Sequence, residues 1–135
     1  MQWATGNIGT RSLREVIRDP DLELVGLVTY ELDGDACEIV TIDALEEGRG
    51  VGTALFEAVQ EAASAAGCER IRLVTTNNNL RALAFYQKRG FRLVALVPGA
   101  VDESRRLKAS IPTEDSTGLP IRDELHLEFL LDHAV

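Results

Sequence analysis

Apolar residues recur along this chain first at helical and then at strand spacing, which predicts a mixed order of elements. From Ile8 to Ile17 the apolar positions have helical spacing, so we expect a short helix near 8–18 that Asp19-Pro20 ends. Two runs rich in apolar and β-branched residues follow, 22–30 and 37–42. The turn sequence Asp33-Gly34-Asp35 lies between them, so they predict an antiparallel hairpin.

The second half of the chain alternates predicted helices and strands. It predicts, in order, a helix over 51–66 that Gly67 ends, a strand over 71–75, a helix from 80 to 88 that follows three asparagines, a strand over 91–97 and a last strand over 125–131. The polar segment 98–118 is expected to be mostly loop, with one helical turn near 102–107. Crossovers through helices favour parallel pairing in part of the sheet, and the hairpin favours antiparallel pairing elsewhere.

Composition narrows the class of protein. At 135 residues, with 45% hydrophobic and 27% charged residues, the chain is expected to fold as one domain over residues 1–135. A net charge of −8, with the basic residues scattered, argues against a nucleic-acid partner. No apolar run is long enough to span a membrane, and the two cysteines match no metal-site spacing. We therefore expect a cytoplasmic protein without a metal.

A glycine-rich turn comes directly before the helix predicted over 51–66. Gly48, Gly50 and Gly52 alternate there, so several backbone N–H groups can face one point at the positive end of the helix. Such a turn suits a phosphate or pyrophosphate, although a tight strand-to-helix turn needed only for packing explains the glycines equally well. The turn has neither the Lys-Ser/Thr ending of a P-loop nor the spacing of a dinucleotide-binding fingerprint.

Two motifs, over 47–52 and 79–91, resemble the signatures of the GNAT superfamily of acetyltransferases. The first, Glu47 to Gly52, is similar to the family's pyrophosphate-binding turn, with Glu47 where Gln or Arg is usual; the second is Asn79-x-x-Ala82-x-x-Phe85-Tyr86-x-x-x-Gly90-Phe91. The resemblance covers roughly residues 22–135. It implies an α/β fold with a mixed, mostly antiparallel central sheet flanked by helices, and acetyl-CoA as co-substrate. The residues it implies for acetyl-CoA binding are Val40, Thr41, Ile42, Gly48, Arg49, Gly50, Val51, Gly52, Thr53 and Asn79.

The resemblance also implies a reaction, N-acetylation by direct attack of an amine on the thioester. The backbone N–H of Ile42 is the candidate donor to the developing oxyanion. Tyr86 is the candidate acid for the departing sulfur, although such a residue taken alone is more often a core aromatic. Glu38 is the candidate base, and an exposed carboxylate at a strand end explains it equally well. Asp43 is a weaker candidate for the base.

Residues 2–27 resemble a different family, the dihydrodipicolinate-reductase-like NAD(P)-binding domains. This resemblance rests on the Gly6-x-x-Gly9 turn between a short apolar start and the predicted helix. It implies a strand-turn-helix at the start of the chain, and residues 1–25 thus form an atypical, shortened N-terminus for a GNAT domain. We therefore expect the acceptor half of the site to be replaced and a homodimer to cover a sheet edge that the loss exposes.

Alternative functions remain open. An acyl-CoA-binding module with little or no catalysis fits the same motifs, and an NAD(P)-binding oxidoreductase fragment fits the N-terminal segment. The acceptor of an enzyme would be an amine of a small molecule or a peptide. The charged stretch Val101 to Thr117 borders either the acceptor or only solvent.

Overall fold

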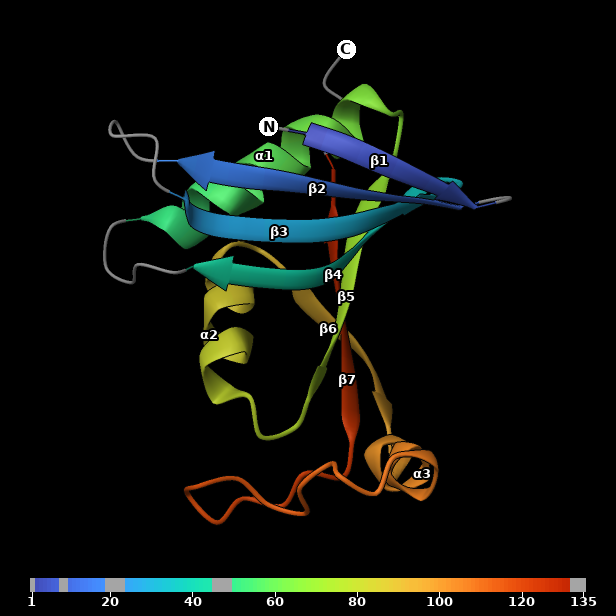
Figure 1. Ribbon diagram of the computed structural model, residues 1–135, viewed down its shortest axis with the longest axis vertical. Helices are drawn as coiled ribbons and strands as arrows, with labels where there is room; N and C mark the ends of the chain where they lie inside the picture. The colour runs from blue at the N-terminus through green and yellow to red at the C-terminus, as the bar shows by residue number, and fades with distance from the viewer. Residues whose placement is uncertain (1, 8–9, 19–23, 45–49, 132–135) are drawn as a thin grey trace. The chain divides into compact units, whose positions relative to one another are not determined.

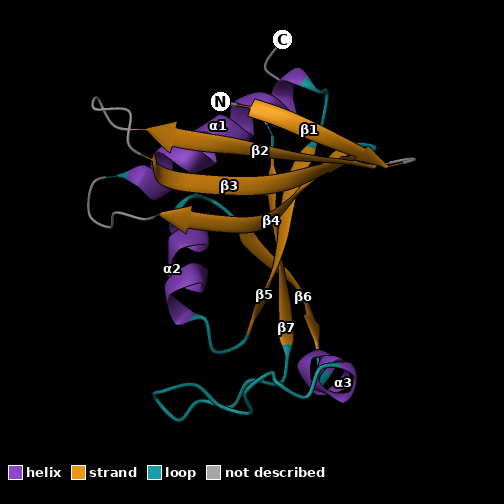
Figure 2. Cartoon of the chain, in the orientation of Figure 1, coloured by secondary structure: helices purple, strands orange, loops and turns teal. Residues whose placement is uncertain are grey.

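The computed structural model describes residues 2–7, 10–18, 24–44 and 50–131. Four strands come first, and helices and strands then alternate (Figures 1 and 2). In chain order they are β1 (Gln2–Asn7), β2 (Thr10–Arg18), β3 (Leu24–Asp33), β4 (Ala36–Ala44), α1 (Val51–Ala65), β5 (Arg70–Thr76), α2 (Leu80–Lys88), β6 (Arg92–Val97), α3 (Ala100–Leu107) and β7 (Glu124–Leu130). The chain divides into two compact units, residues 1–72 with 130–135, and residues 73–129.

The first unit is an antiparallel meander of β1, β2, β3 and β4 with α1 against one of its faces (Figure 1). Buried side chains alternate along β3 and β4, at Val28 and Tyr30 and at Cys37 and Ile39. The alternation places these side chains on one face of each strand, because strand side chains point to opposite sides in turn.

Helix α1 supplies the other half of this core. Its buried positions recur at helical spacing, at Val51, Leu55, Phe56, Val59 and Ala63. Its C-terminus is ended by Gly67, which has a positive φ of 80°. The N–H groups of Gly67 and Cys68 donate to the carbonyls of Ser64 and Ala63, and this pair of bonds is the Schellman arrangement.

The second unit contains the end of β5, then α2, β6, α3 and β7, with the strands in the order β5-β7-β6. Its buried side chains are Leu73, Tyr86, Phe91, Val101 and Leu127. Strands β6 and β7 pair antiparallel, with a bulge between Leu93 and Ala95. The predicted mixed α/β fold with mostly antiparallel pairing is therefore confirmed.

One predicted element is wrong. Residues 10–18 form strand β2 and not the helix expected near 8–18, and they pair antiparallel with β3 from Arg11↔Leu32 to Arg18↔Leu24. A ladder of partners distant in sequence overrides a short helical pattern of apolar residues, because local propensity is a weak prior. The helical turn expected near 102–107 is longer than predicted, since α3 runs over Ala100–Leu107.

Candidate functional site

The start of α1 carries no side-chain cap. Gly50 is its N-cap residue in the left-handed conformation (φ 73°), and the first turn contains no acidic residue. A Cβ added at Gly50 would meet none of the described residues within 4 Å. The first N–H groups of a helix lack carbonyl partners within it, and its positive dipole end attracts anions. This 15-residue helix therefore begins with the features of a phosphate site.

The predicted cofactor residues of β4 lie at an irregularity of the strand. Thr41 is opposite Thr29 and Ile39 is opposite Tyr30, so Val40 has no partner in the β3 register. Val40 is 53% exposed. The hydroxyl groups of Thr41 and Thr29 are 2.6 Å apart. A bulge of this kind bends a strand and leaves backbone groups out of the ladder, which makes them available to a ligand.

Glu38 lies on the same strand and is held by an ion pair. Nε of Arg72 donates to Oε1 of Glu38 at 3.1 Å, and Nη2 of Arg72 donates to Oδ2 of Asp33 at 3.4 Å. The Glu38 side chain is 37% exposed. The carboxylate is thus accessible, and a proton acceptor at this position would have to share its charge with Arg72.

Asn79 begins α2 as its N-cap residue. Its side-chain oxygen accepts from the N–H of Ala82 at 3.3 Å, and its Nδ2 donates to Oγ1 of Thr75 at 3.2 Å. An N-cap of this kind typically stabilises a helix by about 1 kcal/mol. The asparagine predicted to contact the cofactor is exposed and also fixes the start of the helix that carries Tyr86.

Tyr86 is enclosed by aromatic rings. Its ring lies edge-on to Phe85 and to Phe91, with centroids 5.1 Å apart in each case. It is 4% exposed. Burial raises the pKa of Tyr86 to about 12, with Arg89 acting in the opposite direction. The phenol is therefore protonated near neutral pH, as a proton donor must be.

Arg89 fixes the outer side of this aromatic cluster. Its guanidinium carbon lies 3.5 Å from the centroid of the Phe85 ring, and Nη1 donates to the carbonyl of Phe85 at 3.0 Å. Stacking of this kind stabilises the cation and the ring together. The Phe85 ring that borders Tyr86 is thus held from both sides.

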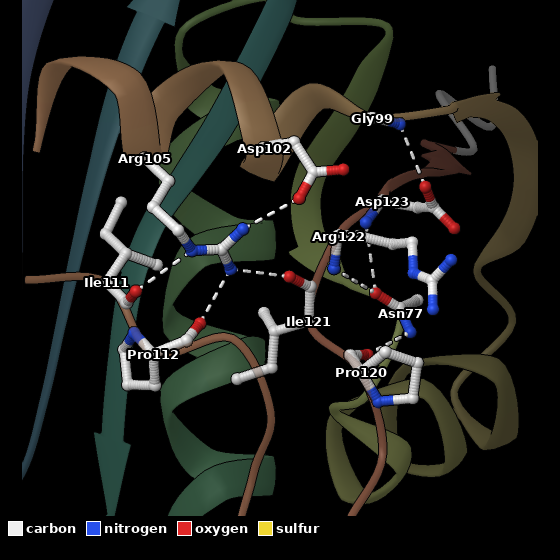
Figure 3. Close-up of polar contacts among 10 residues, drawn as sticks. All are labelled: Asn77, Gly99, Asp102, Arg105, Ile111, Pro112, Pro120, Ile121, Arg122 and Asp123. Carbon is white, nitrogen blue, oxygen red and sulfur yellow. Dashed lines mark hydrogen bonds and ion pairs between the residues drawn. The ribbon is translucent and has the colours of Figure 1, made fainter. Parts of the chain in front are cut away.

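The segment between α3 and β7 is organised by Arg105 (Figure 3). Its guanidinium donates to the carbonyls of Ile111 (3.0 Å), Pro112 (2.6 Å) and Ile121 (2.7 Å), and it pairs with Asp102 at 2.7 Å. The Arg105 side chain is 17% exposed. A fork of five donors can bind several carbonyls at once, so one residue ties both ends of the loop to α3.

Asn77, which directly follows β5, also holds the loop before β7 through hydrogen bonds to its backbone (Figure 3). Its Oδ1 accepts from the N–H groups of Arg122 and Asp123, both at 3.1 Å, and its Nδ2 donates to the carbonyl of Pro120 at 2.8 Å. Oδ1 of Asp123 in turn accepts from the N–H of Gly99 at 2.9 Å. The start of α3 and the end of the loop are therefore connected through Asp123 and Asn77.

Sequence reasoning missed Arg72, Asn77, Arg89 and Arg105. The pair Arg105 and Arg106 was open to interpretation as a solvated charge run, which fits Arg106 at 76% exposure but not Arg105. The asparagine run 77–79 was a signal, since Asn favours turns and caps. Arg72 and Arg89 gave no sequence signal. The partner of Arg72 is Glu38, which is distant in sequence, and Arg89 donates to a backbone carbonyl.

Some expectations lie outside the described residues. Gly48 and Arg49 of the glycine-rich turn are among these, as is Gly9 of the N-terminal turn. Within the part of the chain that the structure describes, no group of three or more His, Cys, Asp or Glu side chains is placed to hold a metal ion. No helix of that part has the length and apolar character to cross a membrane.

Known proteins resemble this chain over most of its length. The model of the acetyltransferase (GNAT) family matches residues 8–91. The uncharacterized protein YdhI of Bacillus subtilis is 47% identical over 110 residues, which are 82% of this chain and 69% of the relative. The family match includes β2 and starts well before residue 22, where the resemblance was predicted to begin.

Two solved structures share the fold. A Bacillus subtilis acetyltransferase in complex with CoA aligns with a TM-score of 0.72 and 25% identity, covering 93% of this chain and 79% of that one. A GNAT family acetyltransferase from Elizabethkingia anophelis with acetyl-CoA bound aligns with a TM-score of 0.76 and 20% identity, covering 92% and 78%.

These findings correct the interpretation of the N-terminus. The resemblance of residues 2–27 to NAD(P)-binding domains is not supported, because the family match begins at residue 8 and β2 replaces the helix that the resemblance requires. The glycine turn, the Asn79 to Phe91 motif and the fold instead agree with the family match. The chain belongs to the GNAT family of acetyltransferases.

Proposed function

We propose that this chain is an N-acetyltransferase that uses acetyl-CoA and transfers the acetyl group to an amine by direct attack. Family membership supports acetyl transfer. Two structures that share the fold were solved with acetyl-CoA or CoA bound, which supports acetyl-CoA as the co-substrate. The observation that carries the proposal is the start of α1 at Gly50, which has no side-chain cap and no described residue within 4 Å of an added Cβ.

The pyrophosphate of acetyl-CoA fits that helix start. A Cβ at Gly50 would meet none of the described residues within 4 Å, and the first turn of α1 carries no carboxylate to repel an anion. We assign the N–H groups of Gly50, Val51, Gly52 and Thr53 to the phosphate oxygens, because a helix N-terminus binds anions through such groups. Gly48 and Arg49 complete the proposed turn, and Asn79 is proposed to contact the cofactor from the start of α2.

The bulged segment of β4 is proposed to bind the pantetheine arm. Val40, Thr41 and Ile42 would offer backbone groups to it in the manner of an added strand. The N–H of Ile42 would donate to the thioester oxygen as negative charge develops there. A donor fixed in a strand costs little reorganisation during the reaction, and one such donor is worth about 3 kcal/mol in barrier height.

Tyr86 is proposed to protonate the sulfur that leaves. Acetyl-CoA supplies a thioester, whose cleavage releases a thiolate with an ordinary pKa near that of a cysteine thiol, about 8.5. Burial raises the pKa of the Tyr86 phenol to about 12, so the phenol keeps its proton at any pH near neutrality and can act as the donor. Its aromatic neighbours hold the ring in one orientation, which suits transfer to a fixed sulfur.

Glu38 is proposed to take the proton from an ammonium acceptor, directly or through water. The carboxylate is exposed enough to reach solvent, and Arg72 orients it. The acceptor is proposed to be a primary amine of a small molecule or peptide. The net charge of −8 favours the approach of such a cation. We also propose that residues 1–135 act as one domain.

Replacing Tyr86 with phenylalanine separates an enzyme from a binding module. We expect Tyr86→Phe to slow acetyl transfer by about 10²- to 10⁴-fold, the usual contribution of a general acid, and to leave the Kd for acetyl-CoA unchanged. Transfer would be followed by mass spectrometry on a panel of amines and peptides, and binding by calorimetry.

Tyr30 offers a matched control. It is the other of the two tyrosines and is buried in the core of the first unit. Tyr30→Phe removes the same hydroxyl group and should leave transfer within a few-fold of the unaltered chain. Equal loss in both variants would mean that Tyr86 acts through stability alone. Acetyl-CoA binding without transfer to any amine would identify a binding module.

A further inference from the structure

The segment between α3 and β7 contains a short hairpin of residues 113–121, called here the loop hairpin. At its base the N–H of Ile121 donates to the carbonyl of Thr113 at 2.9 Å. At its tip the N–H of Gly118 donates to the carbonyl of Asp115 at 3.1 Å. Gly118 has a positive φ of 90°, a conformation that favours glycine. The backbone of the hairpin is therefore closed by its own hydrogen bonds at both ends.

Asp115 organises the tip of the loop hairpin. Its Oδ1 accepts from the N–H and the hydroxyl of Thr117, at 2.8 and 2.6 Å, and from the N–H of Leu119 at 3.1 Å. Asp115 is half-buried, whereas the residues on either side of it are exposed. Hydrogen bonds from Thr117 and Asn78 lower the pKa of Asp115 to about 2. The side chain is therefore a carboxylate that accepts several bonds at once.

The second oxygen of Asp115 reaches the start of α2. Oδ2 of Asp115 accepts from Nδ2 of Asn78 at 3.1 Å. The hydroxyl of Thr76 donates to Oδ1 of Asn78 at 2.6 Å, which leaves Nδ2 to face Asp115. The next residue, Asn79, is the N-cap of α2, and the carbonyl of Asn78 accepts from the N–H of Leu80 at 2.9 Å. The tip of the hairpin is thus bonded to the residue directly before Asn79.

Different side chains hold the loop hairpin at its base and at its tip. Arg105 and Asn77 bond to the backbone at the base (Figure 3). The bond from Asn78 reaches the tip. Asn79, next along the chain, caps α2. Three consecutive asparagines therefore connect both ends of the hairpin to the start of this helix.

We propose that Asp115 is a positioning residue for acetyl-CoA binding: acting through Asn78, its carboxylate fixes the turn that places Asn79 beside the cofactor. This role rests on the proposed function, in which Asn79 contacts acetyl-CoA. The N–H of Asn79 donates to the carbonyl of Thr76 at 3.1 Å, so Asn78 lies inside the turn that this bond closes. Loss of the bond to Asp115 frees Asn78, and a shift of about 1 Å at Asn79 is enough to break a hydrogen bond to a ligand.

Exchanging the donor and the acceptor of this bond tests the role of Asp115 on the full chain. Asn78→Asp places two carboxylates opposite each other, so the bond is lost, while the hydroxyl of Thr76 can still donate to position 78. Adding Asp115→Asn restores one donor and one acceptor in reversed order. The oxygen of the new amide can still accept from Thr117 and Leu119, so the tip keeps its internal bonds.

We expect Asn78→Asp to raise the Kd for acetyl-CoA about tenfold, and the double variant Asn78→Asp/Asp115→Asn to return to within about threefold of the unaltered chain. The matched control is Asn78→Asp/Glu114→Gln, since Glu114 is the exposed acid next to Asp115. The control has the net charge of the double variant but leaves two carboxylates opposite each other, so it should stay weakened. Calorimetry would measure the Kd, and circular dichroism and thermal melting would check the fold.

Hydrogen exchange reports on the hairpin without relying on acetyl-CoA. In the chain without ligand, exchange over 113–121 should speed up in Asn78→Asp and slow again in the double variant. A second measurement uses the unaltered chain and needs no variant to fold. Acetyl-CoA should slow exchange over 113–121 in that chain, because coupling between two sites is reciprocal.

The outcomes distinguish the role of Asp115 from the proposed function. An unchanged acetyl-CoA Kd in Asn78→Asp would overturn the role and leave the proposed function standing. Equal rescue by Asp115→Asn and by Glu114→Gln would do the same, because charge alone would then explain the loss. Acetyl-CoA binding that leaves exchange over 113–121 unchanged would also overturn the role. The absence of acetyl-CoA binding by the folded, unaltered chain would overturn both.

Discussion

Gly50 gives the sharpest test of the proposed phosphate site, through substitution by aspartate and by asparagine. Both side chains tolerate the left-handed conformation better than other residues, and both are preferred N-caps. A Cβ at this position meets none of the described residues within 4 Å, so neither variant clashes with that part of the chain. The two side chains have nearly the same shape and differ in charge. The difference between Gly50→Asp and Gly50→Asn therefore isolates the electrostatic effect at the start of α1.

The magnitude follows from the placement of Gly50. A carboxylate there would lie about 5 Å from a phosphate bound at the helix start, where two unit charges repel by about 1 kcal/mol in water and about 3 kcal/mol at an effective dielectric constant near 20. Gly50 is exposed, so the result should fall within these limits. We expect the Kd for acetyl-CoA to be roughly five- to 150-fold higher for the aspartate variant than for the asparagine variant.

Calorimetric titration of both variants would measure this difference. It should shrink at high salt, because salt screens exposed charges. S-acetylpantetheine, which has no phosphate, should bind the two variants equally. The same Kd for acetyl-CoA in both variants at low salt would show that no phosphate lies at the start of α1 and would refute the assignment of Gly50 to Thr53.

Three further predictions concern the fold. Burial in the folded state raises the pKa of Cys37 from 9.0 to about 12 and that of Tyr86 from 10.0 to about 12. Both groups therefore lose their protons at a lower pH in the unfolded chain than in the folded chain. The free energy of unfolding is at its full value below pH 9 and falls as the pH rises toward 12. At roughly 1.4 kcal/mol per pKa unit, urea denaturation should show a loss of about 4 kcal/mol at pH 11, and an unchanged midpoint would contradict this. Arg105→Lys should speed amide hydrogen exchange over 111–121, because it breaks the fork to three carbonyls, while Arg106→Lys should not. Gly90→Ala should destabilise more than Gly67→Ala in urea, since both residues have positive φ but only at Gly90 would the added Cβ approach Phe129 to 3.3 Å; equal losses near 1–2 kcal/mol would mean that the Phe129 ring moves aside.

Much of the fold was predictable because its signals are local. The hairpin β3–β4 follows from two apolar runs around a Gly turn, and α1 from helical spacing between a glycine-rich start and Gly67. Asn79 as an N-cap also follows from residue type and position. These features depend on a few neighbouring residues, so one sequence suffices to predict them.

The rest depends on contacts between residues distant in sequence. Strand β2 forms through pairing with β3, which the spacing of Leu13, Val16 and Ile17 does not reveal. The Arg105 fork depends on where carbonyls up to 16 residues away lie, and backbone groups leave no sequence signal. The ion pair of Glu38 with Arg72 spans 34 residues. In each case the sequence shows which residue is present, but its partner is known only from the folded structure.

Titration of the unaltered chain with acetyl-CoA tests the central claim most directly. We predict one-to-one binding with a micromolar Kd, weakened by Gly50→Asp and unaffected by Tyr86→Phe. The absence of saturable acetyl-CoA binding by the folded chain would contradict the proposed function.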